Sequence, residues 1–156
     1  RMDVQEDGLV EICPAAPAIM SEIEARIAGR GGAALIVDYG SWRSRGDTLQ
    51  AVKAHAFDDP LAHPGAADLT AHVDFEALAR AAPRLTAAPL TPQGVFLERL
   101  GITPRAQAIA QRLTGAALDG HIAAHRRLTH PDEMGNLFQV LGLTKPGAPM
   151  LPGLGP

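Results

Sequence analysis

The most informative stretch of this chain is Gly31-Gly32-Ala33-Ala34-Leu35-Ile36-Val37-Asp38-Tyr39-Gly40. Five consecutive apolar residues stand there between a glycine pair and a polar turn. A short apolar run without polar alternation is typical of a strand that is buried on both faces of a parallel sheet. Ligands of such sheets bind just beyond the carboxyl ends of the strands. Asp38 and Tyr39 stand at that end, so we expect the functional edge of the protein there.

Helical and extended patterns alternate on both sides of this strand. Apolar residues at helical spacing predict a helix between Pro17 and Gly29, and Asp74 is a suitable N-cap for a helix that ends before Pro83. Further helices are expected over 95–100, 103–115 and 118–128, and further strands over 9–12, 84–91 and 136–143. The residues from 145 to 156 are rich in proline and glycine and are expected to be extended. The alternation of helices and strands predicts the α/β class.

Residues 41–73 form a long segment with little periodicity, in which only 46–52 suggests a short strand or turn. A loop of this length is unusual in a compact domain unless it is functional or contains secondary structure of its own. Its polar cluster of Asp68, Thr70, His72 and Asp74 is therefore a candidate site. Asp74 also has a structural use as a helix cap, which accounts for part of the cluster.

The composition excludes several classes of function. The 156 residues carry 14 Lys and Arg against 17 Asp and Glu, a net charge of −3, so we expect no dedicated nucleic-acid surface. The single cysteine, Cys13, allows no internal disulfide and favours a reducing compartment. We expect no membrane span, because no apolar run approaches about 20 residues, and no secretory signal. Abundant Ala, Gly, Pro and Arg favours the bacterial cytoplasm, with the mitochondrial matrix as the alternative.

Three sequence patterns that often indicate a functional site lack the neighbouring residues or elements that each requires. Residues 29–34 match the dinucleotide-binding pattern, but a helix is predicted before them and a strand after them, the reverse of what phosphate binding requires. His121 and His125 have metal-ligand spacing, but Ile122 stands where zinc proteases carry a glutamate, so a surface or capping role is favoured. Ser41 lies in no Gly-x-Ser-x-Gly turn. We therefore predict neither a metal site nor nucleophilic catalysis.

Several stretches occur together in an order that resembles the MidA-like S-adenosylmethionine-dependent methyltransferases. The most specific is Asp68-Leu69-Thr70-Ala71-His72-Val73-Asp74-Phe75. The other shared stretches are 11–15, 33–40, 46–52, 59–61, 64–65, 93–97, 100–102 and 134–141. That family includes an arginine methyltransferase that acts in the assembly of mitochondrial respiratory complex I.

The resemblance covers nearly all of this chain but only the C-terminal part of the family's length. It implies the class I methyltransferase fold, a Rossmann-like seven-stranded sheet with an antiparallel last strand and helical insertions. The fifth strand would lie near 33–38, an insertion at 41–73, and the sixth and seventh strands near 84–91 and 136–143. The family's glycine-rich cofactor loop is expected upstream, so residues 1–156 would form the C-terminal part of one domain and hold no assigned cofactor-binding residue.

The same resemblance implies methyl transfer from S-adenosyl-L-methionine to a protein side chain, in particular arginine. The family's shared motifs include Asp38, Tyr39, Gly40, Asp68, Thr70, His72, Asp74, Gln93 and Gly94. From position and charge we predict Asp38 and Tyr39 as catalytic residues and the other seven as substrate-binding residues. An arginine acceptor is a planar cation that carboxylates hold bidentately, so Asp38 is the first candidate to hold it and Asp68 the second. The expected partners are a protein substrate, with a complex I subunit as the candidate, and a second copy in a homodimer.

Two other interpretations stay open. If these residues were the complete polypeptide, half of the parallel sheet would be absent. The chain would then be a non-catalytic binding module or a remnant without a cofactor site, which pairs with another chain at its exposed sheet edge. A hydrolase that uses the loop carboxylates is the third interpretation, and no motif supports it.

Overall fold

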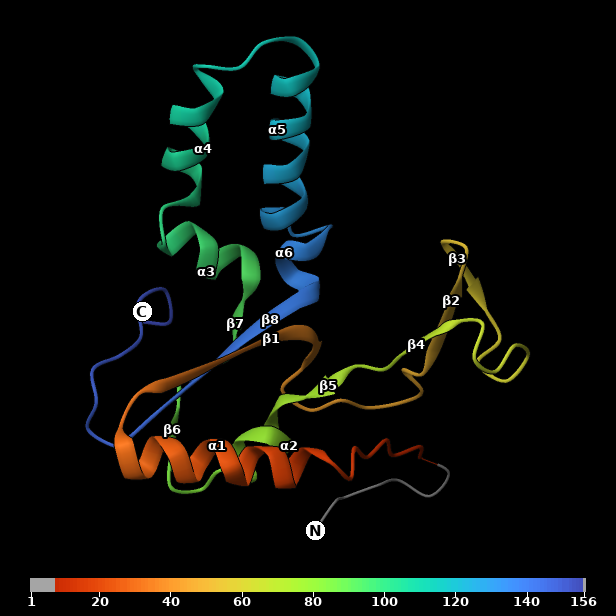
Figure 1. Ribbon diagram of the computed structural model, residues 1–156, viewed down its shortest axis with the longest axis vertical. Coiled ribbons are helices and arrows are strands. Elements are labelled where there is room, and N and C mark those ends of the chain that lie inside the picture. Colours follow the sequence, from red (N-terminus) through yellow and green to blue (C-terminus); the bar gives the residue numbers. More distant parts are fainter. Residues whose placement is uncertain (1–7, 156) are drawn as a thin grey trace.

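The computed structural model describes residues 8–155, which form a five-stranded main sheet, a separate three-stranded sheet and six helices (Figure 1). The centre of the main sheet is the antiparallel pair of β1 (Ala33–Ser41) and β8 (Phe138–Thr144), in register from Ala33 opposite Thr144 to Tyr39 opposite Phe138. The α/β class is therefore confirmed as a sheet with helices. The seven-stranded arrangement stays a prediction, because the main sheet of the described residues has five strands.

Three short strands complete the main sheet. β5 (Val73–Asp74) pairs in parallel with the last two residues of β1, and β6 (Thr86–Ala87) and β7 (Thr91–Pro92) pair with β8. The expected strand at 84–91 is therefore wrong in its length. Pro89 interrupts it, because proline has no N–H to give to the ladder.

The strand predicted at 33–37 is confirmed, but its expected burial on both faces is wrong for this chain. Ala34 and Ile36 pack against the hydrophobic core, whereas the side chains of Leu35 and Val37 on the opposite face are 52% and 46% exposed. The two helices that flank the core cover one face only. A strand buried on both faces needs helices on both.

β1 also has an unpaired edge within residues 8–155. β8 pairs with it along one side, while on the other side only Gly40 and Ser41 are paired, with β5. The edge backbone of residues 33–39 is therefore open to a further strand.

The core lies between the main sheet and two helices, α1 (Ala16–Arg30) and α2 (Phe75–Arg80). Met20 of α1 and Phe75 of α2 are almost completely buried there. Both predicted helices are confirmed, and Asp74 caps α2 by accepting a hydrogen bond from the N–H of Ala77 at 2.8 Å. Burying each of these large apolar side chains stabilises the fold by about 2–3 kcal/mol.

The long segment 41–73 contains secondary structure of its own. Three short antiparallel strands form the small sheet in the order β3-β2-β4, namely β2 (Gln50–Lys53), β3 (Ala56–Asp58) and β4 (Asp68–Thr70). The connection of β2 to β3 is a two-residue turn in which Ala54 and His55 both have positive φ, +51° and +64°. Glycine and asparagine usually take these positions, which explains why the sequence did not indicate a hairpin.

Four helices lie between the main-sheet strands β7 and β8: α3 (Gln93–Arg99), α4 (Ile102–Ala110), α5 (Gly115–Thr129) and α6 (Met134–Leu137). α4 and α5 run side by side and extend away from the main sheet (Figure 1). The helix expected over 103–115 is wrong at its end, because α4 stops at Ala110 and Gly115 begins α5 instead.

Residues 8–13, at the N-terminal end of the described part, have no regular secondary structure. The strand expected at 9–12 is wrong, because these residues join no sheet. Instead the side chain of Glu11 binds Thr48. The expected absence of a secretory signal concerns in part residues 1–7, which lie outside the described residues. No helix of residues 8–155 has the length and hydropathy of a transmembrane span.

A pair of helical glycines provides a matched test of the packing between α3 and α5. A Cβ at Gly94 would lie 2.4 Å from the carbonyl oxygen of Thr129, whereas a Cβ at Gly120 would meet nothing within 4 Å. Gly94→Ala should lower the free energy of unfolding by about 1–3 kcal/mol through overpacking. Gly120→Ala should raise it by about 1 kcal/mol, because alanine favours the helix.

Chemical denaturation of both variants beside the wild type measures the two changes. A Gly94→Ala variant as stable as the wild type would show that α3 and α5 do not approach this closely.

Candidate functional site

Three segments meet at the carboxyl end of β1, around the ring of Tyr39. The ring of His72, just before β5, lies edge-on to the Tyr39 ring with centroids 5.8 Å apart. The ring of Phe138, the first residue of β8, approaches it with centroids 5.5 Å apart and an interplanar angle of 88°. Such edge-to-face pairs are favourable because the positive edge of one ring meets the negative face of the other. Tyr39 is therefore held by partners from two other segments.

Gly40 allows β5 to come close enough for this arrangement. Its φ is +156°, and a Cβ at this position would lie 2.2 Å from the carbonyl oxygen of Val73. A side chain would therefore push β5 away from β1, although the two strands are paired here. Glycine at position 40 is required by the close backbone approach.

A hydrogen-bonded chain holds His72 beside Tyr39. The N–H of His72 donates to the hydroxyl of Thr48 at 2.9 Å. The Thr48 hydroxyl in turn donates to the Glu11 carboxylate, which also accepts the N–H of Thr48 at 2.9 Å. Three segments far apart in the sequence are thus joined behind the ring pair.

The hydrogen bond from the Thr48 hydroxyl holds the pKa of the Glu11 carboxyl below its ordinary value of 4.5. The two N–H groups of Thr48 and Leu49 act in the same direction, against the cost of desolvation. Hydrogen bonds to a carboxylate stabilise the charged form. Glu11 is therefore a fixed negative charge at neutral pH.

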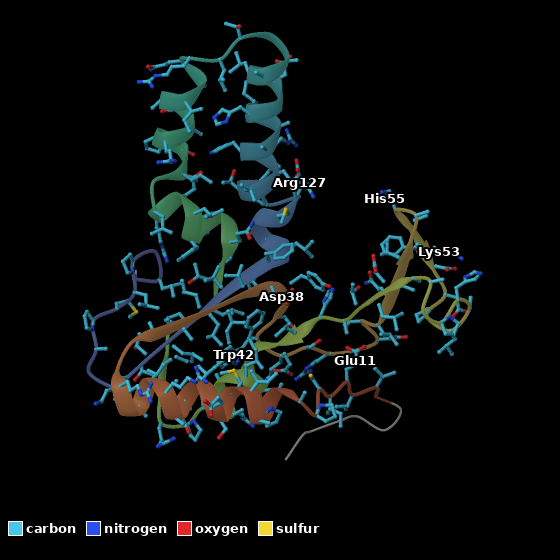
Figure 2. All side chains as sticks on the ribbon, viewed as in Figure 1. Glu11, Asp38, Trp42, Lys53, His55 and Arg127 are labelled. Carbon is cyan, nitrogen blue, oxygen red and sulfur yellow. The ribbon has the colours of Figure 1, made fainter. Side chains whose placement is uncertain are left out.

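Asp38 lies half-buried at the end of β1 (Figure 2). Its Oδ1 accepts the N–H of Tyr39 at 2.8 Å. Its second oxygen, Oδ2, accepts no hydrogen bond within residues 8–155, so it is available to a bound molecule. A half-buried carboxylate at a strand end is suited to orient a cationic group.

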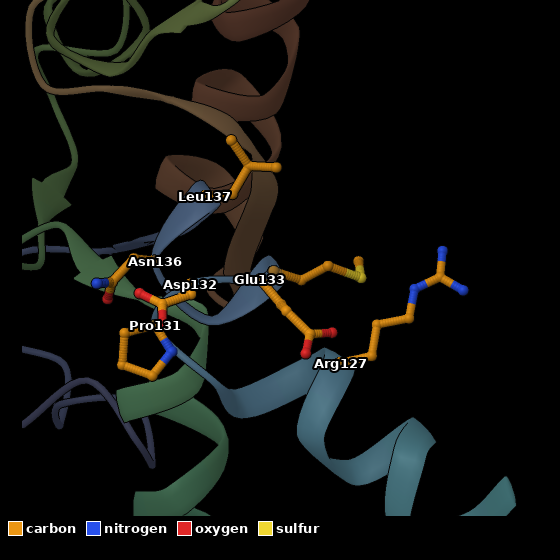
Figure 3. A pocket seen from close by; sticks show the side chains of 7 residues that line it. Arg127, Pro131, Asp132, Glu133, Asn136 and Leu137 are labelled. Atoms are coloured by element: carbon orange, nitrogen blue, oxygen red, sulfur yellow. The ribbon is translucent and has the colours of Figure 1, made fainter. Parts of the chain in front are cut away.

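An open hollow of about 560 Å³ lies at the same end of the sheet (Figure 3). It belongs to the segment that leads from α5 through α6 into Phe138, the partner of Tyr39 in the ladder. Its lining residues are Arg127, Pro131, Asp132, Glu133, Met134, Asn136 and Leu137. Glu133 is already paired with Arg126, whose Nε lies 2.8 Å from its Oε1. Asp38, Tyr39 and His72 do not line the hollow, which is related to them through Leu137, the residue before Phe138. The strand-end position of Asp38 and Tyr39 makes this edge the candidate site.

The structure does not bring all of the predicted site residues to this edge. Asp68 and Thr70 lie on β4 of the small sheet, where they pair with Val52 and Gln50. Asp68 and Asp38 therefore belong to different sheets. Of the loop cluster, His72 contacts the Tyr39 ring, and Asp74 pairs with Ser41 at the end of β1.

Three other predicted residues have structural uses. Asp74 caps α2. The buried side chain of Gln93 donates from Nε2 to the carbonyl oxygen of Leu128 at 2.9 Å, and Gly94 faces the carbonyl oxygen of Thr129. These contacts join α3 to the end of α5. Substrate binding by these three residues stays a prediction.

Glu11, Thr48 and Phe138 are residues of the site that the sequence analysis did not single out. Glu11 and Thr48 are 37 positions apart, so no periodic pattern relates them. All three nevertheless fall within the stretches that carry the family resemblance, and that was the available signal.

The two histidines with metal-ligand spacing have other partners. His121 Nε2 lies 2.9 Å from the carbonyl oxygen of Ala106, and His125 Nε2 lies 3.0 Å from the hydroxyl of Thr103. These contacts join α5 to α4. In the part of the chain that the structure describes, no three His, Cys, Asp or Glu side chains are grouped as metal ligands.

Comparison with protein families and curated proteins gives a consistent result. A family model described as "Putative S-adenosyl-L-methionine-dependent methyltransferase" matches residues 1–93. The mitochondrial protein arginine methyltransferase NDUFAF7 of Rattus norvegicus is 38% identical over 136 residues, which are 86% of this chain and 31% of that protein. Its counterpart in Homo sapiens is 37% identical over 137 residues, again 86% of this chain and 31% of that protein. The chain therefore spans less than a third of the length of these relatives.

Comparison with solved structures agrees with the match to the methyltransferase family. A Burkholderia thailandensis protein crystallised with S-adenosyl-homocysteine superposes with a TM-score of 0.77 and 28% identity, over 97% of this chain and 41% of that one. An uncharacterised protein from the same organism superposes with a TM-score of 0.80 and 27% identity, over 97% of this chain and 42% of that one.

Thr48→Val should loosen the site, because it removes the acceptor of the His72 N–H and a donor to Glu11. We expect the free energy of unfolding to fall by about 1–3 kcal/mol at pH 7. The effect should depend on pH. A carboxyl whose pKa is lowered in the folded state contributes stability above its ordinary pKa, 4.5 here, and loses it as the pH falls through the lower folded value.

The difference between wild type and Thr48→Val should therefore shrink below pH 4.5. Denaturation curves at several pH values measure it. A difference that is constant from pH 7 down to pH 3 would contradict the role of the Glu11 charge.

Proposed function

The chain belongs to the S-adenosyl-L-methionine-dependent methyltransferase family whose model it matches, and from this premise we propose that it forms the C-terminal part of one catalytic domain. In that domain the carboxyl end of β1 faces the methyl acceptor. The resemblance to MidA-like methyltransferases is confirmed by the family match and by the relatives. The activity of the whole protein is the proposal.

The observation that carries this proposal is the incomplete environment of β1. One edge of residues 33–39 is unpaired within the described residues, and Leu35 and Val37 are exposed on the face without helices. A central strand of a doubly wound sheet is normally paired on both edges and covered on both faces. The relatives are about three times as long as the matched part. We propose that the upstream part of the protein supplies the neighbouring strand, the second helical layer and the glycine-rich cofactor loop.

S-adenosyl-L-methionine is the proposed methyl donor, which the neighbour bound to S-adenosyl-homocysteine supports. Residues 8–155 contain no glycine-rich loop that follows a strand and opens a helix. This chain instead offers a carboxylate and an aromatic ring at a strand end. Those groups fit the acceptor side of the reaction, so we assign the main donor contacts to the upstream part.

Arginine in a protein is the proposed acceptor, because the relatives are named protein arginine methyltransferases. The donor, when bound, would supply its sulfonium methyl group: the S–CH3 bond breaks as the N–CH3 bond forms on a guanidinium nitrogen, S-adenosyl-homocysteine leaves, and the proton of that nitrogen passes to water. Asp38 would accept hydrogen bonds from the guanidinium and turn one nitrogen toward the donor. Tyr39 follows Asp38 on the opposite face of β1, where its ring packs against His72 and Phe138 and holds the strand end in place. Such positioning supplies several kcal/mol of the barrier in displacement reactions.

The compartment and the acceptor protein are also proposals. The curated relatives are named mitochondrial, which supports the mitochondrial matrix. The structural neighbours come from a bacterium, and the bacterial cytoplasm stays a prediction. A subunit of respiratory complex I stays the candidate acceptor through the family resemblance. Homodimer formation stays a prediction as well.

Asp38→Asn in the complete protein should lower the rate of arginine methylation at least about tenfold, because it removes a charge-assisted hydrogen bond to the acceptor. Tyr39→Phe keeps the ring contacts and should retain most of the activity. Asp119→Asn on α5 makes the same charge change far from the site in sequence and serves as the control. Transfer of radiolabelled methyl groups to the acceptor measures all three rates.

Calorimetry with S-adenosyl-L-methionine tests the proposed family function independently of the acceptor. Wild type and Asp38→Asn should both bind the donor. An unchanged methylation rate in Asp38→Asn would remove Asp38 from the mechanism, and absent donor binding by the complete protein would contradict the methyltransferase function.

A further inference from the structure

The small sheet stands apart from the main sheet (Figure 1) and buries very little of itself. Among the residues of β2, β3 and β4, only Ala51 is buried. The side chains of Phe57 and Leu69 are 81% and 60% exposed. Both faces of this small element therefore leave a large apolar side chain open to contact with another molecule.

The small sheet is also acidic. Residues 50–70 carry Asp58, Asp59 and Asp68 against the single Lys53. The helical hairpin of α4 and α5, residues 102–129, has the opposite balance, with four arginines against one aspartate. An acidic surface attracts cationic partners and raises their rate of association.

The register of the small sheet gives each of its two faces one acidic residue and two apolar residues. Phe57, Val52 and Asp68 stand opposite one another across the three strands and so share a face. Asp58, Ala51 and Leu69 form the corresponding row on the other face. β4 therefore presents the acidic Asp68 to one side and the apolar Leu69 to the other.

β4 is an edge strand. It pairs with β2 on one side, and within residues 8–155 no strand pairs with its other side. An unpaired edge offers N–H and C=O groups to an added strand. A residue of that strand beside Asp68 would share its face, and the next residue would lie beside Leu69 on the opposite face.

We propose that the free edge of β4 binds the acceptor protein as an added strand, an extended cationic segment in which arginines alternate with apolar residues. This inference rests on the proposed function, since it names how that acceptor is held. Arginines of the segment lie beside Asp68, and its apolar residues lie beside Leu69. Backbone hydrogen bonds supply affinity, and the alternating side chains supply specificity.

The place of β4 in the chain connects this surface to the candidate site. His72 follows Thr70 by two residues, about 7 Å of extended chain. Its ring lies against that of Tyr39, the residue that follows Asp38 in β1. A strand docked along β4 therefore runs toward the end of β1, and its length decides which arginine reaches the carboxylate.

Charged residues on edge strands also prevent unwanted pairing between copies, so Asp68 has a purely protective alternative role. The two roles differ in what they predict for a cationic strand. If Asp68 is only protective, a cationic strand does not bind to β4. If Asp68 takes part in docking, the strand binds, and its affinity depends on its charge, on its backbone N–H groups and on the alternation of its arginine and apolar side chains.

The test uses the complete protein and a fluorescent eight-residue peptide of alternating arginine and valine, with binding measured by anisotropy. Asp68→Asn should weaken binding about threefold, within the range of a cross-strand charge pair, and Asp68→Lys about tenfold, because it replaces the attraction by a repulsion. Asp119→Lys on α5 is the matched control and should bind as the wild type does. Added salt should weaken binding, and peptides with glutamate for arginine or with N-methylated backbone should not bind.

Equal binding by Asp68→Lys and the wild type, or by the N-methylated peptide, would overturn the proposal. So would an equal loss in Asp119→Lys, because binding would then follow net charge alone. Calorimetry with S-adenosyl-L-methionine on the same samples separates the two proposals. Donor binding without an effect of Asp68→Lys on the peptide contradicts the docking surface alone, and peptide docking without donor binding contradicts the proposed function alone.

Discussion

The close backbone contact between Gly40 and Val73 is the constraint on which the rest of the structure depends. A Cβ at position 40 would lie 2.2 Å from the Val73 carbonyl oxygen, so only glycine lets β5 pair with the end of β1. Two consequences follow along the chain in opposite directions. Phe75, two residues after Val73, enters the core at the start of α2, and His72, one residue before it, reaches Tyr39. One steric condition thus connects the hydrophobic core to the candidate site.

The parts of the fold that could be predicted from the sequence are those in which local pattern and tertiary packing agree. β1, α1 and the Asp74 cap of α2 have clear patterns, and each is present. The small sheet was missed because its strands are three or four residues long and its hairpin turn uses Ala54 and His55 at positive φ. Burial of β1 on both faces could not be judged from an apolar run, since it depends on which layers lie above and below the strand.

Some residues of the candidate site could likewise be predicted from the sequence, and others could not. Asp38 and Tyr39 follow from the rule that strand ends carry function, which needs only the position of β1. The contact of Tyr39 with His72 depends on a parallel pairing that no local pattern reveals. For Asp74 and Gly94, the family motif alone does not separate function from structure. Asp74 is a helix cap, and Gly94 allows a close contact between helices. A shared motif identifies required residues without separating those that bind from those that pack.

The small sheet is held at the point where it meets the site. The chain enters it after Thr48 and leaves it before His72, and these two residues are hydrogen-bonded to each other at 2.9 Å. The Glu11 carboxylate binds Thr48 from a third segment, so the base of the sheet is closed while its outer strands remain exposed. An element fixed only at its base keeps its direction relative to Tyr39 and needs no cover along its length. Because the small sheet is already ordered, little conformational entropy is lost in the sheet when a partner binds. It is therefore suited to hold a flexible polypeptide near the Asp38 carboxylate.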